Sequence, residues 1–486
     1  MPSLALSSTD AAAVDADVLV IGLHTGEDGP VAAPGAASVH AAWDGLIDTL
    51  VLLGATGKAG TITKVPTPAG VTAPVLVAIG LGDADDVTAE TLRRAGGTAV
   101  RTATGKQKVA FAIDGDADEL ALGALLGLHR FPDYKTGERP ATDNPVAEIE
   151  LVGATALSGR AEAIGNAVNT ARVWADTPGN LLRPPAFAAS VAEAATAAGL
   201  DVEVLDENAL ADGGYGGILA VGGGSTHQPR LVKLSYRADG ADKHVALVGK
   251  GITFDTGGIS IKPAQGMWAM KGDMAGAAAV AGAMLAIAAL APAVNVTAWL
   301  PMAENMPSGD AYRPGDVVTT YSGKTVEIIN TDQEGRMVLC DALARAAEDE
   351  PDVIYDAATL TGGQVVALGK RISGVMGTDE ECARVKAAGE RTGEAMWPMP
   401  MPEEIRKTFE SPIADVLQGS ANMERSGHML QGGIFLSHFV PEDMPWAHID
   451  IAGPADNGGE AYGYVAKGAT AVPLRTLVEL VEEHAA

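Results

Sequence analysis

The feature that most constrains this chain is a stretch of 30 residues, Met274 to Ala303, that carries no formal charge. A stretch of that length is stable only where it is removed from water, in a protein core or in a membrane. Many of its residues are Ala and Gly, which are weakly apolar, and Pro292 divides it. We therefore expect a buried helix over about 274–291 and a buried strand over about 294–300, and no membrane crossing.

The rest of the chain alternates short apolar runs with Ala-rich segments, which is typical of α/β structure with a largely parallel sheet. In the first part we expect strands over 14–23, 73–81 and 108–114, and helices over 89–104 and 118–131. From residue 184 onward the same pattern predicts strands over 201–205, 216–221, 229–236, 244–249, 352–358 and 447–452, and helices over 186–199, 336–349 and 474–483.

These elements predict two α/β domains of unequal size. We expect a small N-terminal domain over residues 1–155 and a larger C-terminal domain over residues 156–486, joined by a helix at about 158–175. Residues 132–147 are rich in Pro, Thr and charge and indicate an exposed connection. The larger domain should have a mixed, mainly parallel central sheet flanked by helices, with functional groups at the carboxyl ends of its strands.

The charge balance excludes several classes of partner. Acidic residues outnumber basic ones by 62 to 34, which gives a formal net charge of −28. A negative surface repels phosphate backbones and anionic lipid, so we expect no nucleic-acid or membrane partner. The two cysteines, Cys340 and Cys382, cannot form a disulfide framework, and the first 20 residues contain no Lys or Arg. We therefore expect a cytoplasmic protein without a signal peptide.

Charged residues recur where an expected strand ends or a buried helix begins. Lys250 ends the apolar run HVALVG, and Asp255 follows it just before the paired glycines 257 and 258, which permit unusual backbone conformations. Asp273 opens the uncharged Ala-rich helix. Each has an ordinary alternative: a salt bridge beside a turn for Lys250 and Asp255, and helix capping for Asp273.

A third cluster lies in the sequence INTDQEGR, residues 329–336. Asp332 and Glu334 are two residues apart, so an extended loop can direct both carboxylates toward one ion. Two carboxylates about 4 Å apart repel by about 4 kcal/mol at an effective dielectric of about 20, so a cation is needed to hold them together. Arg336 can supply part of that charge, and a pair of divalent cations can supply more.

Together the three loops hold four carboxylates and two lysines, the pattern of a two-metal hydrolytic site. No His-x-x-x-His pair or Cys cluster offers a conventional zinc site, so the predicted ligands are mainly oxygen atoms. His448 lies in an expected core strand, and we expect a buried, hydrogen-bonded histidine there rather than a ligand.

Several motifs resemble one known family. NTDQEGR is very similar to the Asn-Thr-Asp-Ala-Glu-Gly-Arg signature of the leucine aminopeptidase family of dinuclear metallopeptidases, with Gln333 in place of the usual Ala. VGKGITFDTGG, MKGDMAGAA, DAATLTGG, WAHIDIAG and GATAVPLRTLVELV resemble further blocks of the family in the same order. The resemblance runs from about Ala163 to the end, whereas the first 150 residues match only in length and pattern.

The resemblance implies a metal-dependent aminopeptidase that releases leucine and other bulky apolar residues from the N-termini of peptides. It implies two divalent cations, zinc or manganese, with magnesium or cobalt as alternatives. By similarity, Lys262 is the electrophile that stabilises the oxyanion of the tetrahedral intermediate, and Arg336 anchors a bicarbonate that acts as general base. One ion would be held by Asp255, Asp332 and Glu334, and the other by Lys250, Asp255, Asp273 and Glu334. The residues that match the pocket for the first side chain are Met270, Thr359, Leu360, Gly362 and Ala452.

The chain also departs from the family pattern. The Gln333 side chain should point away from the ions, and Thr256 keeps the hydroxyl of the usual Ser. Gly363 replaces a usual Ala, and Ala471 with Pro473 replaces a segment that contains Gly; these changes affect the expected pocket shape rather than the chemistry. The resemblance further implies a homohexamer with active sites facing an interior cavity.

Two other functions compete with peptide hydrolysis. Metal-assisted phosphoester hydrolysis uses similar carboxylates but usually recruits His, which these loops lack. Some members of the family also bind DNA. Residues 1–155 hold 10 basic against 20 acidic residues, so nucleic-acid binding is not expected here.

Overall fold

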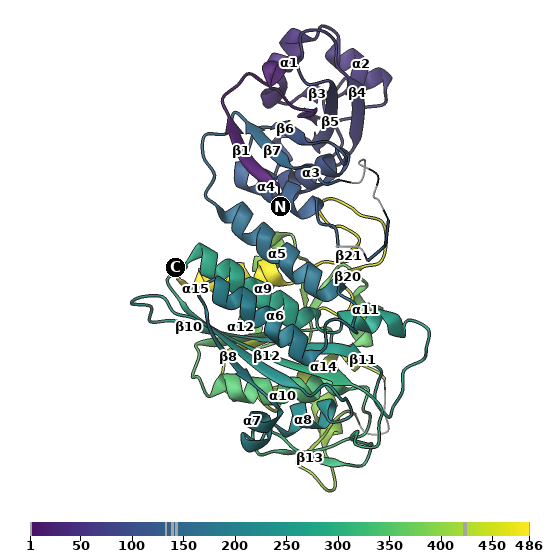
Figure 1. Ribbon diagram of the computed structural model, residues 1–486, viewed down its shortest axis with the longest axis vertical. Helices are drawn as coiled ribbons and strands as arrows, with labels where there is room; N and C mark the ends of the chain where they lie inside the picture. The colour runs from purple at the N-terminus through teal and green to yellow at the C-terminus, as the bar shows by residue number, and fades with distance from the viewer. Residues whose placement is uncertain (1, 132–133, 138–139, 141–143, 421–424, 486) are drawn as a thin grey trace. The chain divides into compact units, whose positions relative to one another are not determined.

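The computed structural model describes residues 2–485 apart from 132–133, 138–139, 141–143 and 421–424 (Figure 1). The expected exposed connection, residues 132–147, therefore lies partly outside the described residues. The chain divides into two compact units, Met1–Asn166 with Gly458–Lys467, and Ala167–Asn457 with Gly468–Ala486. The boundary expected between residues 155 and 156 falls in the loop between strand β7 and helix α5 (Arg160–Asp176).

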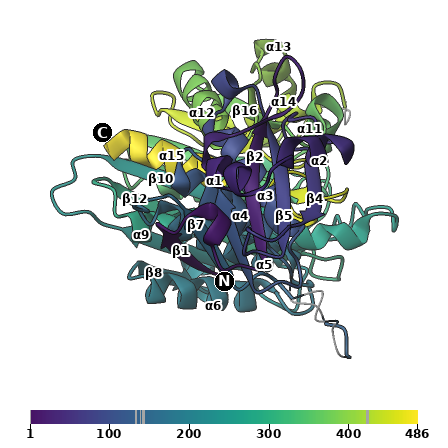
Figure 2. The same cartoon turned by 90° about the horizontal axis from the view of Figure 1, so that it is seen from above.

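The first unit is built around a seven-stranded sheet in the order β1-β7-β6-β2-β5-β4, with β3 paired to β2. Figure 2 shows β2, β5 and β4 side by side. All neighbours on the main path are parallel except β4 with β5, so the expected largely parallel sheet is confirmed. Its elements include β1 (Ser3–Ser7), β2 (Val18–His24), β3 (Val31–Ala32), β4 (Ile62–Pro66), β5 (Val75–Gly82), β6 (Lys108–Ala112), β7 (Glu148–Val152), α3 (Ala89–Arg101) and α4 (Ala117–Gly127).

The second unit contains a nine-stranded sheet in the order β17-β16-β19-β15-β10-β12-β9-β8, with β11 paired to β12. The central strands β12, β10, β15 and β19 run parallel, whereas β9, β8 and β16 are antiparallel to their inner neighbours. The expected mixed, mainly parallel sheet is thus confirmed. The strands are β8 (Asp201–Leu205), β9 (Arg230–Tyr236), β10 (His244–Gly249), β11 (Gly251–Asp255), β12 (Asn295–Asn305), β15 (Val353–Ala358), β16 (Ser373–Gly377), β17 (Met396–Pro398) and β19 (Trp446–Asp450).

Helices cover both faces of this second sheet. Figure 1 shows α9 and α10 on opposite faces, and the central strands are accordingly buried along almost their whole length. Strands buried on both faces need continuous apolar runs, which is why β10 reads HVALVG. The principal helices are α6 (Pro184–Ala197), α8 (Gly216–Gly222), α9 (Ala275–Leu290), α10 (Glu334–Ala347), α11 (Gly362–Leu368), α12 (Asp379–Thr392), α14 (His428–Ser437) and α15 (Leu474–Ala485).

The uncharged stretch forms the expected buried helix and strand, α9 and β12. The helical segment Met267–Leu290 is long and apolar enough to cross a membrane, but 78% of its most apolar window is buried inside the protein. It packs as a core helix against the sheet. Strand β12 extends to Asn305, five residues beyond the predicted end, because its last residues pair with β11.

Two local predictions are wrong. Residues 216–221, expected as a strand, form helix α8. The buried Asp341 carboxylate accepts a hydrogen bond of 2.9 Å from the Ile218 N–H at the start of this helix, an interaction that a short apolar run does not reveal. Residues 251–255, expected as a loop, form strand β11.

Candidate metal centre

The charged residues of the three motifs lie where strands of the second sheet end and helices begin. Lys250 directly follows β10, and Asp255 is the last residue of β11. Asp273 follows the 3-10 turn Met267–Gly272, directly before α9, and Glu334 is the first residue of α10. Because β10, β11 and β12 are parallel, their carboxyl ends meet at one edge of the sheet, as expected for an α/β site.

Two lysines hold the carboxylates together. Lys250 Nζ lies 2.8 Å from Asp273 Oδ2 and 2.9 Å from Glu334 Oε1, and it donates a hydrogen bond of 2.9 Å to the carbonyl oxygen of Thr359. Lys262 Nζ lies 2.6 Å from both Asp255 Oδ2 and Asp332 Oδ1. The structure therefore brings all five predicted ligands and Lys262 together.

Burial and mutual repulsion change the acidity of these groups. Burial, together with repulsion from Glu334 and Asp273, raises the pKa of Asp255 to about 8. Burial also raises the pKa of Asp273 to about 6, against the attraction of Lys250. Burial disfavours the charged form of Lys250, but Asp273 and Glu334 outweigh it and raise the pKa of this lysine. Four carboxylates thus face two ammonium groups, which leaves an excess of negative charge.

The donor set fits divalent cations. Asp255, Asp273 and Glu334 are buried, and each offers an oxygen atom within 4.8 Å of the others. Glu334 Oε2 is buried and accepts no hydrogen bond from any described residue. Oxygen-rich, negatively charged sites of this kind suit hard and borderline cations. For Lys250 to join them as a ligand, its amine must lose a proton, a change that a nearby dication favours.

Arg336 lies in the first turn of α10 and is 2% exposed. Its Nη1 donates a hydrogen bond of 2.8 Å to Gln418 O, and its guanidinium carbon lies 5.5 Å from the centre of the Phe435 ring. Burial lowers the pKa of Arg336 to about 10. Its Nε is buried without a partner among the described residues, and it forms no ion pair with any of them. Arg336 therefore does not neutralise the carboxylates by direct contact.

The predicted pocket residues come from the loops around Asp273 and from the loops after β15 and β19. The Asp273 N–H donates to Met270 O at 3.2 Å, and Thr359 Oγ1 donates to Asp273 Oδ1 at 2.7 Å. Leu360 and Ala452 both donate a backbone hydrogen bond of 3.2 Å to Asp450 Oδ1.

The buried Asp450 carboxylate also accepts from Thr361 Oγ1 at 2.6 Å, directly before Gly362 at the start of α11. Asp450 therefore ties together the two loops, one after β15 and one after β19, that carry most of the predicted pocket residues.

Sequence reasoning missed two buried amides that support the site. Asn305 donates to Asp255 Oδ1 at 2.8 Å. Gln418 Oε1 accepts from the Asn330 N–H at 3.1 Å, within the NTDQEGR loop. The sequence marks Asn305, because it is a polar residue at the end of a long apolar strand. No local sequence pattern marks Gln418. The Gln333 side chain lies against Gly419, where an added Cβ would be 2.5 Å from Gln333 Oε1.

His448 lies within electrostatic reach of Arg336 and Asp450. His448 is fully buried, and its Nδ1 lies 2.6 Å from Asp356 Oδ1, so the expected buried, hydrogen-bonded histidine is confirmed.

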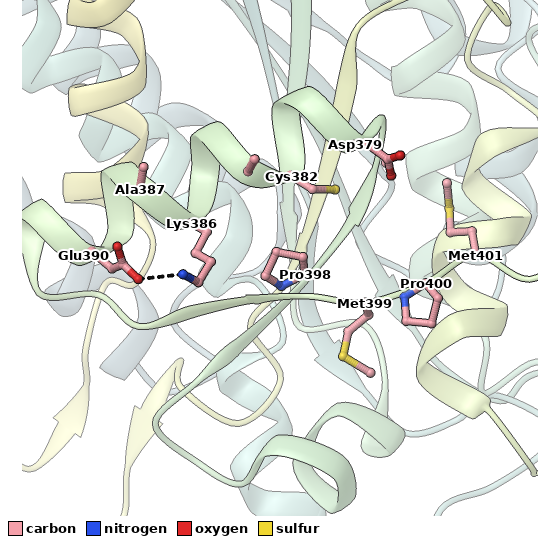
Figure 3. A pocket seen from close by; sticks show the side chains of 11 residues that line it. Asp379, Cys382, Lys386, Ala387, Glu390, Pro398, Met399, Pro400 and Met401 are labelled. Atoms are coloured by element: carbon pink, nitrogen blue, oxygen red, sulfur yellow. Dashed lines mark hydrogen bonds and ion pairs between the residues drawn. The ribbon is translucent and has the colours of Figure 1, made fainter.

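A hollow of about 490 Å³ is lined by residues of α12 and of the segment 398–401 (Figure 3). Its Lys386 is paired with Glu390 at 2.8 Å, and none of the predicted site residues lines it.

Comparison with known proteins covers both units. Residues 169–478 match the catalytic domain of the cytosol aminopeptidase family, and residues 20–138 match its N-terminal domain. Probable cytosol aminopeptidases from Streptomyces griseus and Nocardia farcinica are each 50% identical to the chain. The first alignment covers 100% of the chain and 99% of the relative, and the second covers 99% and 97%.

Solved structures agree with these matches. The bottromycin maturation enzyme BotP in complex with Mn is 37% identical with a TM-score of 0.84, over 97% of this chain and 100% of that one. A tomato leucine aminopeptidase mutant is 28% identical with a TM-score of 0.88, over 99% and 97% of the two chains. With the buried carboxylate cluster, these matches show that the chain belongs to the cytosol aminopeptidase family and is a metal-dependent aminopeptidase of the leucyl type.

Proposed function

We propose that this aminopeptidase releases leucine and other bulky apolar residues from peptide N-termini, using two divalent cations, Lys262 and a bicarbonate held by Arg336. The observation that carries the proposal is the convergence of four carboxylates and two lysines on one edge of the second sheet, with ion-pair distances of 2.6–2.9 Å. The family membership supplies the reaction class, and the geometry supports the roles that we propose for individual residues.

Asp255, Asp332 and Glu334 would hold one ion, and Lys250, Asp255, Asp273 and Glu334 the other. When bound, divalent cations acidify a water molecule and polarise the scissile carbonyl. The ligand oxygens suit manganese or zinc, with magnesium and cobalt as alternatives. The manganese complex of BotP supports manganese as a candidate.

Lys262 is suited to stabilise an oxyanion. Its side chain is 21% exposed, whereas that of Lys250 is 2% exposed, so Lys262 is the lysine that a substrate can reach. Asp255 and Asp332 raise its pKa against the opposing effect of burial and keep it charged. The attraction between such a positioned ammonium group and the carbonyl oxygen becomes stronger as negative charge develops on that oxygen in the transition state.

Arg336 is suited to bind a small planar oxyanion. A guanidinium presents a planar fork of donors that matches a bidentate oxyanion such as bicarbonate. Its Nε has no partner among the described residues, and only Nη1 is bonded to Gln418 O. A bicarbonate in this position would accept the proton of the attacking water, a role that no histidine in the cluster provides.

The pocket for the first side chain would be formed by Met270, Thr359, Leu360, Gly362 and Ala452. Met270 and Leu360 are apolar, and Gly362 and Ala452 leave room, so the lining favours bulky apolar residues. Peptides with charged first residues should be poorer substrates, because their charge would lose hydration without gaining a partner.

The direct test is a panel of aminoacyl anilides assayed after chelation and addition of single metals, with a phosphomonoester as the competing substrate. We expect the leucyl substrate to be among the best, with manganese or zinc restoring the rate. Turnover of the phosphomonoester without turnover of aminoacyl substrates would contradict the proposal.

We also propose that the enzyme is a cytoplasmic homohexamer. Relatives that are 50% identical are named cytosol aminopeptidases, which supports the location. Light scattering after size exclusion should give six times the chain mass of 49.4 kDa, and a monomeric mass would contradict the assembly.

A further inference from the structure

Asn305 is a buried amide at the edge of the candidate metal centre. It is the last residue of β12 and is 1% exposed. Its Nδ2 donates hydrogen bonds of 2.8 Å to Asp255 Oδ1 and 3.0 Å to Thr331 O. One side chain thus joins the end of β11 to the loop that carries Asp332.

The backbone of Asn305 strengthens the same connection. Its carbonyl oxygen accepts from the Thr256 N–H at 3.1 Å and from Thr256 Oγ1 at 2.8 Å. Gly258 has a φ of +65°, and an added Cβ there would lie 2.7 Å from Asn305 Oδ1. Asn305 is therefore enclosed by the loop after β11, and its amide has little freedom to turn.

This arrangement distinguishes the two oxygens of Asp255. Oδ1 accepts from Asn305 Nδ2 and from the Gly257 N–H, both at 2.8 Å. Oδ2 instead faces Lys262 at 2.6 Å. A carboxylate held on one oxygen by two fixed donors presents the other oxygen in a fixed direction, which is how neighbouring groups orient metal ligands.

We propose that Asn305 is a positioning residue that orients Asp255, so that Oδ2 alone faces the ions, and that fixes the distance from Asp255 to the Thr331–Asp332 loop. The proposal rests on the ligand assignment of the proposed function. Both proposed ions share Asp255 and Glu334, but only one of them also needs Asp332, whose loop Asn305 holds through Thr331 O. Loss of the Asn305 amide should therefore weaken the binding of that ion more than the binding of the ion that Lys250 and Asp273 complete. Asn305 touches the loops of the first group and no residue that serves only the second.

The test compares Asn305→Leu with Asn295→Leu in the full-length protein. Leucine has the same branched arrangement of side-chain heavy atoms as asparagine, but methyl groups replace the amide oxygen and nitrogen. Asn295 begins the same strand, and its amide bonds Ala241 O at 3.1 Å and the Ala238 N–H at 3.2 Å, away from every predicted ligand. Each chelated protein is titrated with Mn²⁺ by calorimetry, with free Mn²⁺ measured by electron paramagnetic resonance.

We expect two Mn²⁺ sites in the wild type and in N295L. In N305L one site should weaken by about 10- to 100-fold, the range found when groups that orient metal ligands are removed. The thermal unfolding midpoints of the two chelated variants report any general loss of stability. If N305L does not fold, Asn305→Ala leaves space for a bridging water and should weaken the same site by a smaller factor.

The outcomes separate the two proposals. Two wild-type affinities in folded N305L or N305A would overturn the role of Asn305 alone. Equal weakening of both sites in N305L and N295L would assign the effect to stability and also overturn it. A wild-type protein that binds no Mn²⁺ contradicts the ligand assignment, and the role of Asn305 with it.

Discussion

The sheets of the two units are built alike but end differently. Both are largely parallel and both carry Ala-rich helices, yet the strand ends of the first sheet are closed by backbone. An added Cβ at Gly35 would lie 2.7 Å from the carbonyl oxygen of Ala112 at the end of β6, and one at Gly57 would collide with the carbonyl oxygen of His24 at the end of β2. Main chain therefore packs closely against these two strand ends.

In the second sheet, glycines at the corresponding edge make room for charged side chains. An added Cβ at Gly335 would lie 2.7 Å from Lys250 Nζ, and one at Gly257 would lie 2.8 Å from Asp332 Oδ1. Glycines at the second edge therefore lie against charged side chains as well as main chain, since an added Cβ at Gly276 would collide with the carbonyl oxygen of Ala357. In this protein the candidate site lies at the sheet edge whose loops admit charged side chains, and changes at either edge should therefore have different effects.

The largest effect should follow from making the second edge less charged. Glu334→Gln keeps the shape of a predicted bridging ligand but removes the charge that holds a dication, so we expect kcat to fall by several orders of magnitude. Asp332→Asn should act in the same direction. Near-wild-type rates, measured with a leucyl anilide alongside metal content, would mean that this loop is a structural turn.

Lys262→Ala should lower kcat by about 10² to 10³, the effect of losing one oxyanion donor. The metal content should stay at the wild-type level, because Lys262 contacts Asp255 and Asp332 without being a predicted ligand. A parallel fall in metal content and rate would assign Lys262 a structural role instead.

The affinity for Mn²⁺ should depend on pH. Ions bind ionised carboxylates, and protons compete for Asp255, whose pKa is about 8, and Asp273, whose pKa is about 6. The Kd should therefore rise as the pH falls from 8 to 6, by about tenfold per pH unit for each proton displaced, the proton of Lys250 included, and most steeply near pH 6. Calorimetric titrations at pH 6, 7 and 8 measure this slope. A Kd that is constant over this range would mean that binding displaces no proton from Asp255, Asp273 or Lys250.

Much of this arrangement can be predicted from the sequence. The 30 uncharged residues have few ways to be buried, so α9 and β12 are found at almost their predicted places. The loops that carry the proposed ligands are also predictable, because burying a carboxylate next to an apolar run costs free energy unless a cation or a donor compensates it. Strand β11 is not, since its five residues depend on pairing with the end of β12.

The role of Asn305 escapes prediction for the same reason. Its bond to Asp255 spans 50 residues and exists only once β11 and β12 pair. Gln418 lies 85 residues from Gln333, whose carbonyl oxygen it binds, and no local pattern marks it. Long-range amide contacts that support a site therefore become visible only in the folded chain.

A moderate effect should come from replacing one glycine at each sheet edge with alanine. Gly335→Ala would press a methyl group on the buried Lys250 side chain and displace it from Asp273 and Glu334, so we expect lower activity and metal affinity. Gly35→Ala would press on main chain instead, so the free energy of unfolding should fall by about 1–3 kcal/mol with activity per folded molecule retained. Activity assays and urea unfolding of both variants measure the contrast, and identical profiles would remove the distinction between the two edges.

The smallest effect should follow from Ala291→Gly, which tests how much glycine contributes to the free energy of unfolding through backbone conformation alone. Ala291 ends α9 with a φ of 52°, a left-handed conformation that costs a residue with a Cβ about 1–2 kcal/mol. It is exposed and lies near the amino end of β12, opposite the edge that carries the proposed ligands. Ala291→Gly relieves the strain but adds about 0.4–1 kcal/mol of unfolded-chain entropy, so the free energy of unfolding should rise by about 0.5–1 kcal/mol. Urea unfolding of the chelated protein measures the change, and kcat should not move. A loss of stability at this site would mean that the helix end gains more from the alanine side chain than from relaxed backbone. The difference between the two sheet edges would then have to be explained by side-chain packing as well as by the space that glycine leaves.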